Sequence, residues 1–241
     1  MPDDFALFLP YLLLATGIGI LGGLIASFWN PNARARSAIQ HFAAGGVLAA
    51  VASSVIPEAE QMGTTAGILS GFAAGGLAMI GLKWIVVSAE RENKGKHQLP
   101  VGLAAAAVVD TLLDGVIISA GFAVNRQLGT LLVIALSIEL FFLTLSVGVE
   151  FRKSQFKLWQ KLLVTSGIAS MLLVGAVGAS FLLADVSEST LAIVLSFGAA
   201  SLIYLIAEEL LVETIQAEDS LFSTATLFSG FLVILALKLV G

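Results

Sequence analysis

Three acidic side chains stand inside stretches of sequence that are otherwise apolar enough to cross a lipid bilayer. Asp110 and Asp114 occur in VVDTLLDGVIISAGF, and Glu139 occurs in ALSIELFFLTLSVGV. Placing one charged side chain at the centre of a bilayer costs at least about 2.5–3.5 kcal/mol. A spacing of four residues puts Asp110 and Asp114 on one face of a helix. The pattern therefore indicates a site for a shared cation, either a metal ion or protons.

The same three acids also have a structural interpretation. Acids in a membrane can stay protonated and hydrogen-bond to neighbouring helices. Three ionised acids at one depth would repel one another, and without a bound cation each would be costly to solvate. A shared cation resolves both difficulties, and at this stage the two interpretations stay open.

The composition identifies an integral membrane protein. The 241 residues are 58% hydrophobic and only 12% charged, and the mean hydropathy is +0.98, far from the balance of soluble globular domains. Eight apolar stretches recur, each near the ~20 residues that cross ~30 Å of hydrocarbon: 5–28, 37–57, 64–88, 99–122, 129–149, 159–183, 190–214 and 221–240. We therefore predict an all-α integral membrane protein whose eight transmembrane helices form one membrane domain over residues 1–241.

The sequence argues against several other classes of protein. The absence of cysteine excludes disulfides, thiolate metal ligands and a cysteine nucleophile. No basic patch indicates a nucleic-acid partner. Neither the Gly-x-Gly-Asp and Tyr-Asp motifs of intramembrane aspartyl proteases nor a His-Glu-x-x-His motif occurs. We therefore expect no enzymatic activity, and we expect a cation and the lipid bilayer as partners; a homodimer is left open.

The loops indicate which way the chain crosses the membrane. Positive residues gather in the links that follow the first, third and fifth helices: Arg34, Arg36, Arg91, Lys94, Lys96, Arg152, Lys153, Lys157 and Lys161. Because cytoplasmic loops are rich in Lys and Arg, we expect both termini on the non-cytoplasmic side of a plasma (inner) membrane. Asp3 and Asp4 argue against a cleaved signal peptide. At about 1.5 Å per residue, Asp110 and Glu139 then lie near the membrane midplane.

A weak internal repeat relates the second and seventh helices. Phe42 to Gln61 aligns without gaps onto Phe197 to Gln216. The second helix runs outward and the seventh runs inward, so the pair predicts an inverted-topology repeat, from which many alternating-access transporters are built. The register places these residues opposite one another: Ser53 with Glu208, and Ser54 with Glu209.

Several motifs together resemble those of the ZIP (Zrt/Irt-like) metal transporters. They are Ile56-Pro57-Glu58-Ala59 in the second helix, Asp110-Thr111-x-x-Asp114-Gly115 in the fourth, and Gly198 to Tyr204 followed by Glu208-Glu209-Leu210 in the seventh. The resemblance covers nearly the whole chain and implies a bundle with a 3+2+3 inverted repeat around a midmembrane divalent-metal site. It sets Asp110 at the family's histidine, Thr111 at its asparagine and Asp114 at its acid.

The fifth helix departs from the family pattern. Glu139 falls at the first histidine, whereas Leu140 and Leu143 stand where ligands are usual, and Thr144 replaces a glycine. The resemblance then implies a one-metal site with these oxygen donors: Asp110, Asp114 and Glu139, helped by Thr111, Ser53, Ser54 or backbone carbonyls. A ZIP-fold protein that has lost metal transport, and that moves another solute or senses ions, is the alternative left open.

The donor atoms also bear on the identity of the metal. A site made of oxygen atoms suits Mn²⁺, Mg²⁺ or Ca²⁺ better than the histidine-rich sites associated with zinc, although zinc accepts carboxylates. We expect facilitated transport of manganese or iron(II) into the cytoplasm, with zinc and proton coupling left open, and no permanently bound cofactor. On the inner side, His41 and Glu208 are candidate ligands of a release path, and Lys83 should extend its amine to the surface. Pro57 should end the second helix.

Overall fold

The computed structural model describes residues 5–29, 31–92, 101–152, 157–210 and 221–240. This part of the chain is 94% helical, contains no strand, and has eight helical spans long and apolar enough to cross a membrane. The prediction of an all-α, multi-pass membrane protein is therefore confirmed. Some sequence predictions concern residues outside the described ranges: Asp3, Asp4, Lys94, Lys96, Lys153 and the Gln216 end of the repeat.

Six of the eight spans are single helices: α1 (Phe5–Phe28), α4 (Thr65–Glu92), α5 (Val101–Val124), α6 (Arg126–Arg152), α7 (Leu158–Leu182) and α10 (Leu221–Val240). The second span is composite and consists of α2 (Ala33–Ala50), the π-helix η1 (Val51–Val55) and α3 (Ile56–Met62). The seventh span consists of α8 (Glu188–Leu205) and the π-helix η2 (Ile206–Leu210). Short π-helical turns are rare in proteins as a whole, but those that occur are often found at functional sites.

The second span continues past Pro57, where the sequence predicted its end. Pro57 lies in the first turn of α3, and the helix runs on to Met62. Proline removes the hydrogen bond to the carbonyl four residues earlier, and the wider turn of η1 directly before it accommodates this loss. The prediction was wrong because a helix tolerates proline at a point where its hydrogen-bonding pattern changes.

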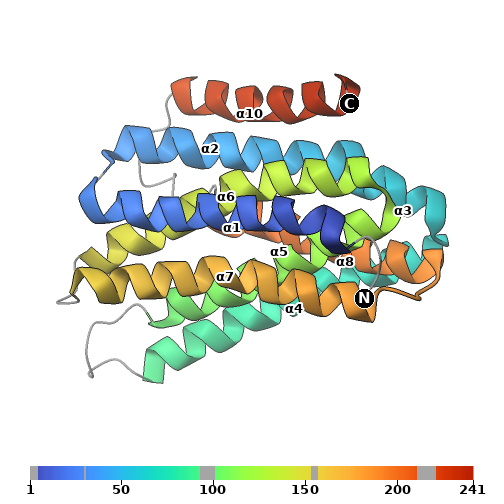
Figure 1. Cartoon of the computed structure of the whole chain (residues 1–241), viewed down its shortest axis with the longest axis horizontal. Coiled ribbons are helices and arrows are strands. Elements are labelled where there is room, and N and C mark those ends of the chain that lie inside the picture. Colours follow the sequence, from blue (N-terminus) through green and yellow to red (C-terminus); the bar gives the residue numbers. More distant parts are fainter. Residues whose placement is uncertain (1–4, 30, 93–100, 153–156, 211–220, 241) are drawn as a thin grey trace.

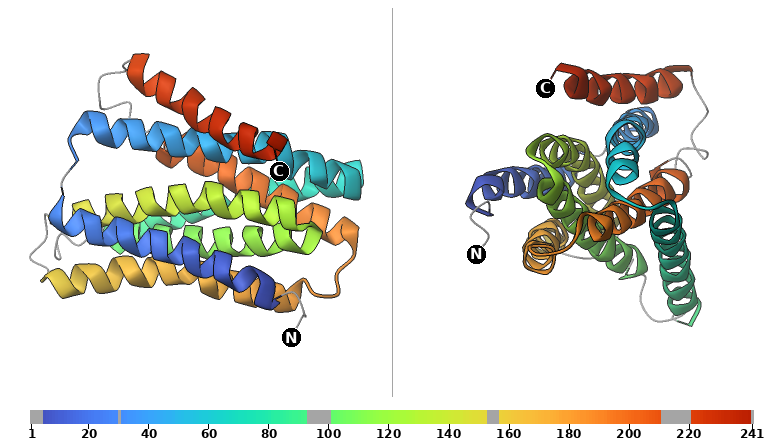
Figure 2. Two further views of the ribbon diagram at one scale, coloured as in Figure 1. Left: turned by 45° about the horizontal axis from the view of Figure 1, so that its top comes forward. Right: turned by 90° about the vertical axis from the view of Figure 1, so that its right-hand side faces the viewer.

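Four pairs of helices make the most extensive contacts: α1 with α6, α5 with α7, α2 with α10, and α4 with α8. In the most apolar stretch of each helix, 78% of residues are buried in α6, against 17% in α4 and in α10. Figure 2 shows α4 and α10 at the rim on different sides, and Figure 1 shows α1 beginning and α10 ending at one end of the bundle. The helix α6, which carries one of the three acids, is thus the most buried of the eight spans.

Two glycines let the rim helices approach their neighbours closely. A Cβ atom at Gly75 on α4 would overlap the carbonyl oxygen of Phe197 on α8, and one at Gly230 on α10 would overlap that of Phe42 on α2. Small residues at such contacts let helices associate in lipid, where no hydrophobic force draws them together. In the alignment that pairs Phe42 with Phe197, Gly75 is paired with Gly230. The two close contacts are therefore made at equivalent positions of the repeat.

Further details coincide in this register. Asn32 falls on Ser187, and each side chain caps its helix by accepting a hydrogen bond from the backbone N–H three residues later, at 2.8 Å and 3.2 Å respectively. The π-helix η1 falls on η2. The likeness between the second and seventh spans thus includes their irregular turns and extends beyond the aligned residues to their N-terminal caps.

Candidate metal centre

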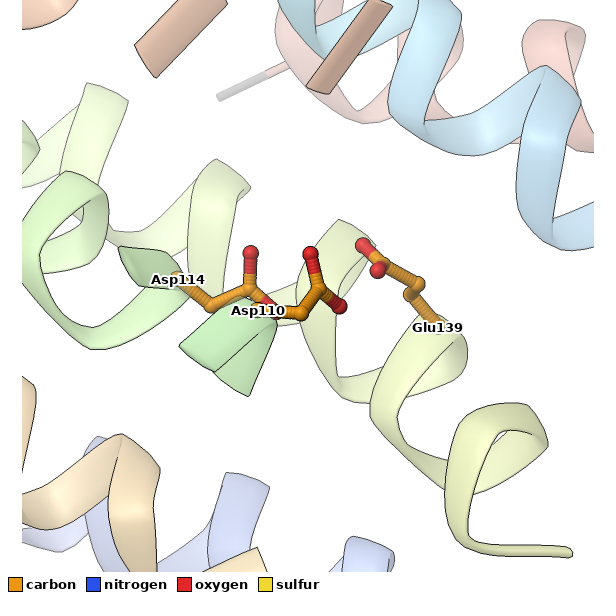
Figure 3. Close-up of side chains that lie close together, drawn as sticks. All are labelled: Asp110, Asp114 and Glu139. Atoms are coloured by element: carbon orange, nitrogen blue, oxygen red, sulfur yellow. The ribbon is translucent and has the colours of Figure 1, made fainter. Parts of the chain in front are cut away.

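Asp110 and Asp114 on α5 meet Glu139 on α6 in the interior of the bundle, and together we call them the acidic triad. One carboxylate oxygen from each residue lies within 4.8 Å of those of the other two, and the exposed fractions of the three residues are 5%, 1% and 1%. Figure 3 shows the carboxyl groups turned toward one another, with Asp110 between the other two. The convergence predicted from spacing and depth is observed, and metal coordination by the triad stays a prediction.

Close packing of α7 against α5 fixes the helix that carries two of these acids. A Cβ atom at Gly115, directly after Asp114, would overlap the carbonyl oxygen of Leu172 on α7. One at Gly175 on α7 would overlap that of Leu112 on α5. These contacts bring the backbones of α5 and α7 close together at the level of the two aspartates. In this structure both aspartates lie on the continuous helix α5 and face α6.

The spacing of the three oxygens suits a single divalent cation. Two oxygens on opposite sides of one ion are separated by twice the metal–oxygen distance, about 4.0–4.2 Å for octahedral Mg²⁺ and about 4.6–5.2 Å for Ca²⁺. Separations of up to 4.8 Å fall within or just above these ranges. Small side-chain rotations therefore suffice to bring all three oxygens onto one ion, and donors of oxygen alone match hard cations such as Mn²⁺.

Two of the hydroxyl groups predicted to assist the metal, those of Thr111 and Ser54, have other hydrogen-bond partners. Thr111 is fully buried, and its Oγ1 donates to the carbonyl oxygen of Ala107 at 2.7 Å. Ser54 lies on η1, where its hydroxyl is 3.4 Å from that of Ser53. Each hydroxyl oxygen keeps lone-pair capacity for a further bond, and coordination of metal by either stays a prediction.

His41 and Glu208 are not part of the acidic triad. Among the histidines and acids that the structure describes, the group whose donor atoms converge contains the triad alone. His41 Nδ1 lies 2.8 Å from the carbonyl oxygen of Ser37 on its own helix, and Glu208 on η2 forms an ion pair with Lys83 on α4. Their predicted role is on a release path outside the central site, and it stays a prediction.

The face of α6 that carries Leu140 and Thr144 packs against α1. A Cβ atom at Gly19 on α1 would lie 2.7 Å from Leu140 Cγ, and Thr144 Oγ1 donates to the Gly19 carbonyl at 2.7 Å. Both residues are fully buried. Helix contact therefore accounts for a leucine and a threonine on this face, and Glu139 is the acid that α6 contributes to the interior.

Sequence reasoning missed two lysine contacts. Lys238 on α10 donates a hydrogen bond to the carbonyl oxygen of Ser53 on η1, and Lys83 was expected at the surface without a partner in Glu208. The repeat relates the two contacts, because the register that pairs Ser53 with Glu208 also pairs Lys83 with Lys238, so either contact, once known, indicates the other.

No protein-family model matches this sequence, and no curated protein matches it. The family resemblance in the motifs therefore stays a hypothesis. The function has to be inferred from the acidic triad, its burial and the helices that hold it.

Proposed function

We propose that this protein transports a divalent metal cation, of the manganese, iron or zinc class, across the membrane into the cytoplasm. One observation carries the proposal: three carboxylates with donor oxygens within 4.8 Å of one another lie buried on two membrane spans. Such a group is stable in a low-dielectric interior only when a cation or protons neutralise it. The ion is the substrate, and the proposal includes no permanently bound cofactor and no enzymatic reaction.

The fold that we propose is a ZIP-like 3+2+3 bundle, in which the spans α1 to α4 and α7 to α10 are inverted copies on either side of α5 and α6. In this arrangement α1 corresponds to α7, α2 to α8, α4 to α10, and α5 to α6. The contacts support it, because the pair α1 and α6 then corresponds to the pair α7 and α5, and the pair α2 and α10 corresponds to the pair α8 and α4. The caps, the π-helices and the close glycine contacts coincide in the same register. The triad then lies on the two helices at the centre of the pseudo-symmetry.

Transport follows from rocking of the inverted copies about the triad, which exposes it to one side at a time. A divalent ion neutralises two of the three negative charges of the ionised triad. A proton can neutralise the third, which offers a route for proton coupling. Lys and Arg gather in the links after the first, third and fifth spans. By the positive-inside rule, the start of α1 and the end of α10 then lie on the non-cytoplasmic side of a plasma (inner) membrane.

Metal uptake into reconstituted vesicles tests the proposal. Metal-free vesicles that contain the protein should take up Mn²⁺ or Fe²⁺, and Asp114→Ala should reduce the uptake to that of protein-free vesicles. Glu188→Gln removes an exposed acid in the first turn of α8, so it is the matched control and should keep the uptake of the parent. Undiminished uptake by Asp114→Ala would refute the assigned site.

Equilibrium metal binding separates transport from its main alternative. A protein that binds Mn²⁺ through the triad but moves none is an ion sensor. A protein whose triad binds no divalent cation carries another solute. Either result would contradict metal transport while leaving the description of the fold unchanged.

A further inference from the structure

A polar cavity of about 210 Å³ lies near the end of the bundle where α6 begins. Its lining includes Ser53, Ser54, Glu58, Gln61, Gln127 and Lys238. Leu128 and Leu131 line it from α6, and Glu139 lies about two turns, or about 12 Å, farther along the same helix. In the proposed orientation this cavity, which we call the outer pocket, lies between the outside and the acidic triad.

Lys238 joins three elements at the outer pocket. Its Nζ donates to the carbonyl oxygen of Ser53 on η1, and its own carbonyl oxygen accepts a hydrogen bond from Gln127 Nε2 on α6 at 3.3 Å. Pro57 has no N–H, so it cannot make the α-helical hydrogen bond to Ser53, four residues earlier. The proline thus leaves an acceptor at the wall of the pocket, and a lysine from the rim helix α10 takes it.

Lys83 makes the equivalent contact at the other end of the bundle. It lies on the rim helix α4 and pairs with Glu208 on η2. In the register of the repeat Lys83 falls on Lys238, and Glu208 falls on Ser53, the third residue of each π-helix. A lysine from a rim helix therefore reaches the same position of a π-helix twice, once at each end.

We propose that Lys238 and Lys83 are a matched pair of gates, Lys238 closing the outer end of the ion path and Lys83 the inner end. The proposal rests on the transport function proposed above. Each lysine ties a rim helix to an irregular turn and keeps a positive charge beside the path, so a cation passes only after the lysine moves aside. At the inner end, a departing ion competes with Lys83 for the Glu208 carboxylate.

The absence of cysteine makes a single-cysteine reporter specific. Ser54→Cys places a thiol in the lining of the outer pocket, at a residue that is 6% exposed. The rate at which a water-soluble maleimide labels this thiol in detergent-solubilised, metal-free protein measures opening of the pocket. Lys238→Met should raise the rate several-fold, and Lys238→Arg, which keeps the positive charge, should leave it near that of the parent. An unchanged rate in Lys238→Met would overturn the outer gate.

A second variant keeps this test decisive if Lys238→Met fails to fold. Pro57→Ala restores an N–H that can bond to the Ser53 carbonyl and so competes with Lys238 for this oxygen, while the lysine itself is retained. The labelling rate should again rise several-fold. A rate equal to that of the parent would show that the contact between Lys238 and Ser53 does not close the pocket.

The same reporter tests the inner gate with the opposite sign. Loss of the inner gate favours the state that is open inward, in which the outer pocket is shut, so Lys83→Met should lower the labelling rate of Ser54→Cys. The charge-swapped pair Lys83→Glu with Glu208→Lys should restore it. A rate that rises or stays unchanged in Lys83→Met, or a swap that restores nothing, would overturn the inner gate.

Failure of the gates and failure of the transport proposal are distinguishable. Labelling is measured without metal, so it does not depend on whether the triad binds an ion. Expected labelling together with undiminished uptake in Asp114→Ala would keep the gates and remove the metal site. Lost uptake in Asp114→Ala together with unchanged labelling in the lysine variants would keep the site and remove the gates.

Discussion

Replacement of Asp114 by asparagine should abolish the stabilisation of the protein by metal while leaving the fold intact. Asparagine has nearly the same shape as aspartate and retains an acceptor oxygen, but it carries no charge. Asp114 is 1% exposed, and its donor oxygen lies within 4.8 Å of those of Asp110 and Glu139. The substitution therefore removes one of three negative charges without creating a cavity.

Two effects can be calculated: the change in stability of the metal-free protein, and the loss of the rise in melting temperature with Mn²⁺. At an effective dielectric constant of about 20, two unit charges 4.8 Å apart repel by about 3.5 kcal/mol. Protons neutralise part of the metal-free triad, so this value is an upper bound on the repulsion that Asp114→Asn removes, and the metal-free variant should melt at a higher temperature than the parent. A ligand at a hundred times its dissociation constant stabilises by about 2.7 kcal/mol. At about 2–4 °C per kcal/mol, Mn²⁺ at that concentration should raise the melting temperature of the parent by about 5–11 °C. The variant should show almost no rise.

Thermal unfolding of the detergent-solubilised protein, followed by tryptophan fluorescence with and without Mn²⁺, measures both effects. Glu188→Gln is again the control, because it removes an exposed acid at the start of α8 and should keep the full rise. A rise in Asp114→Asn equal to that of the parent would show that the triad does not bind the ion. A lower melting temperature without metal would show that Asp114 is a structural hydrogen-bonding group, as the alternative interpretation holds.

Two other contacts are tested by the same fluorescence assay. Glu208→Gln breaks the pair with Lys83, whose side chains are 39% and 51% exposed. An exposed pair contributes at most about 1 kcal/mol, so the melting temperature should change by less than about 4 °C and the rise with Mn²⁺ should persist; its loss would place Glu208 in the central site. Gly75→Ala should lower the melting temperature because its Cβ overlaps the Phe197 carbonyl. Gly76→Ala, with nothing within 4 Å of the added atom, should raise it, since alanine favours a helix by about 0.8–1.0 kcal/mol; equal effects would contradict the close contact of α4 with α8.

The convergence of the acidic triad could be predicted because each step depended on a local regularity. The spacing of Asp110 and Asp114 fixes a shared helix face. The number of residues from Glu139 to the end of its span fixes its depth, because the thickness of the bilayer sets where a span begins and ends. Neither step requires knowledge of how the helices pack. For this reason the three acids were expected together before their separation of at most 4.8 Å was known.

The partners of the other candidates could not be predicted, because they depend on which faces of the helices meet. In lipid, apolar residues do not distinguish a buried face from an exposed one. Leu140 and Leu143 look alike in the sequence, yet Leu140 is fully buried against α1, whereas Leu143 is only partly buried. Lys83 and Glu208 are 125 positions apart, and only the packing of α4 on α8 brings them together. A repeat register makes such a contact predictable only once the equivalent contact in the other copy is known.

The two proposed gate contacts differ in chemistry although their positions are equivalent, and the difference bears on how each gate opens. The acceptor of Lys83 is the carboxylate of Glu208, whereas the acceptor of Lys238 is the backbone carbonyl of Ser53. A divalent cation binds a carboxylate much more strongly than a single neutral carbonyl, so an ion that leaves the triad inward can itself displace Lys83. At the outer end an arriving ion gains little from Ser53, and the pocket has to open through movement of α10. Ion binding therefore favours opening of the inner gate over the outer one, which speeds exchange of the ion at the inner end, whereas the metal gradient sets the direction of net movement.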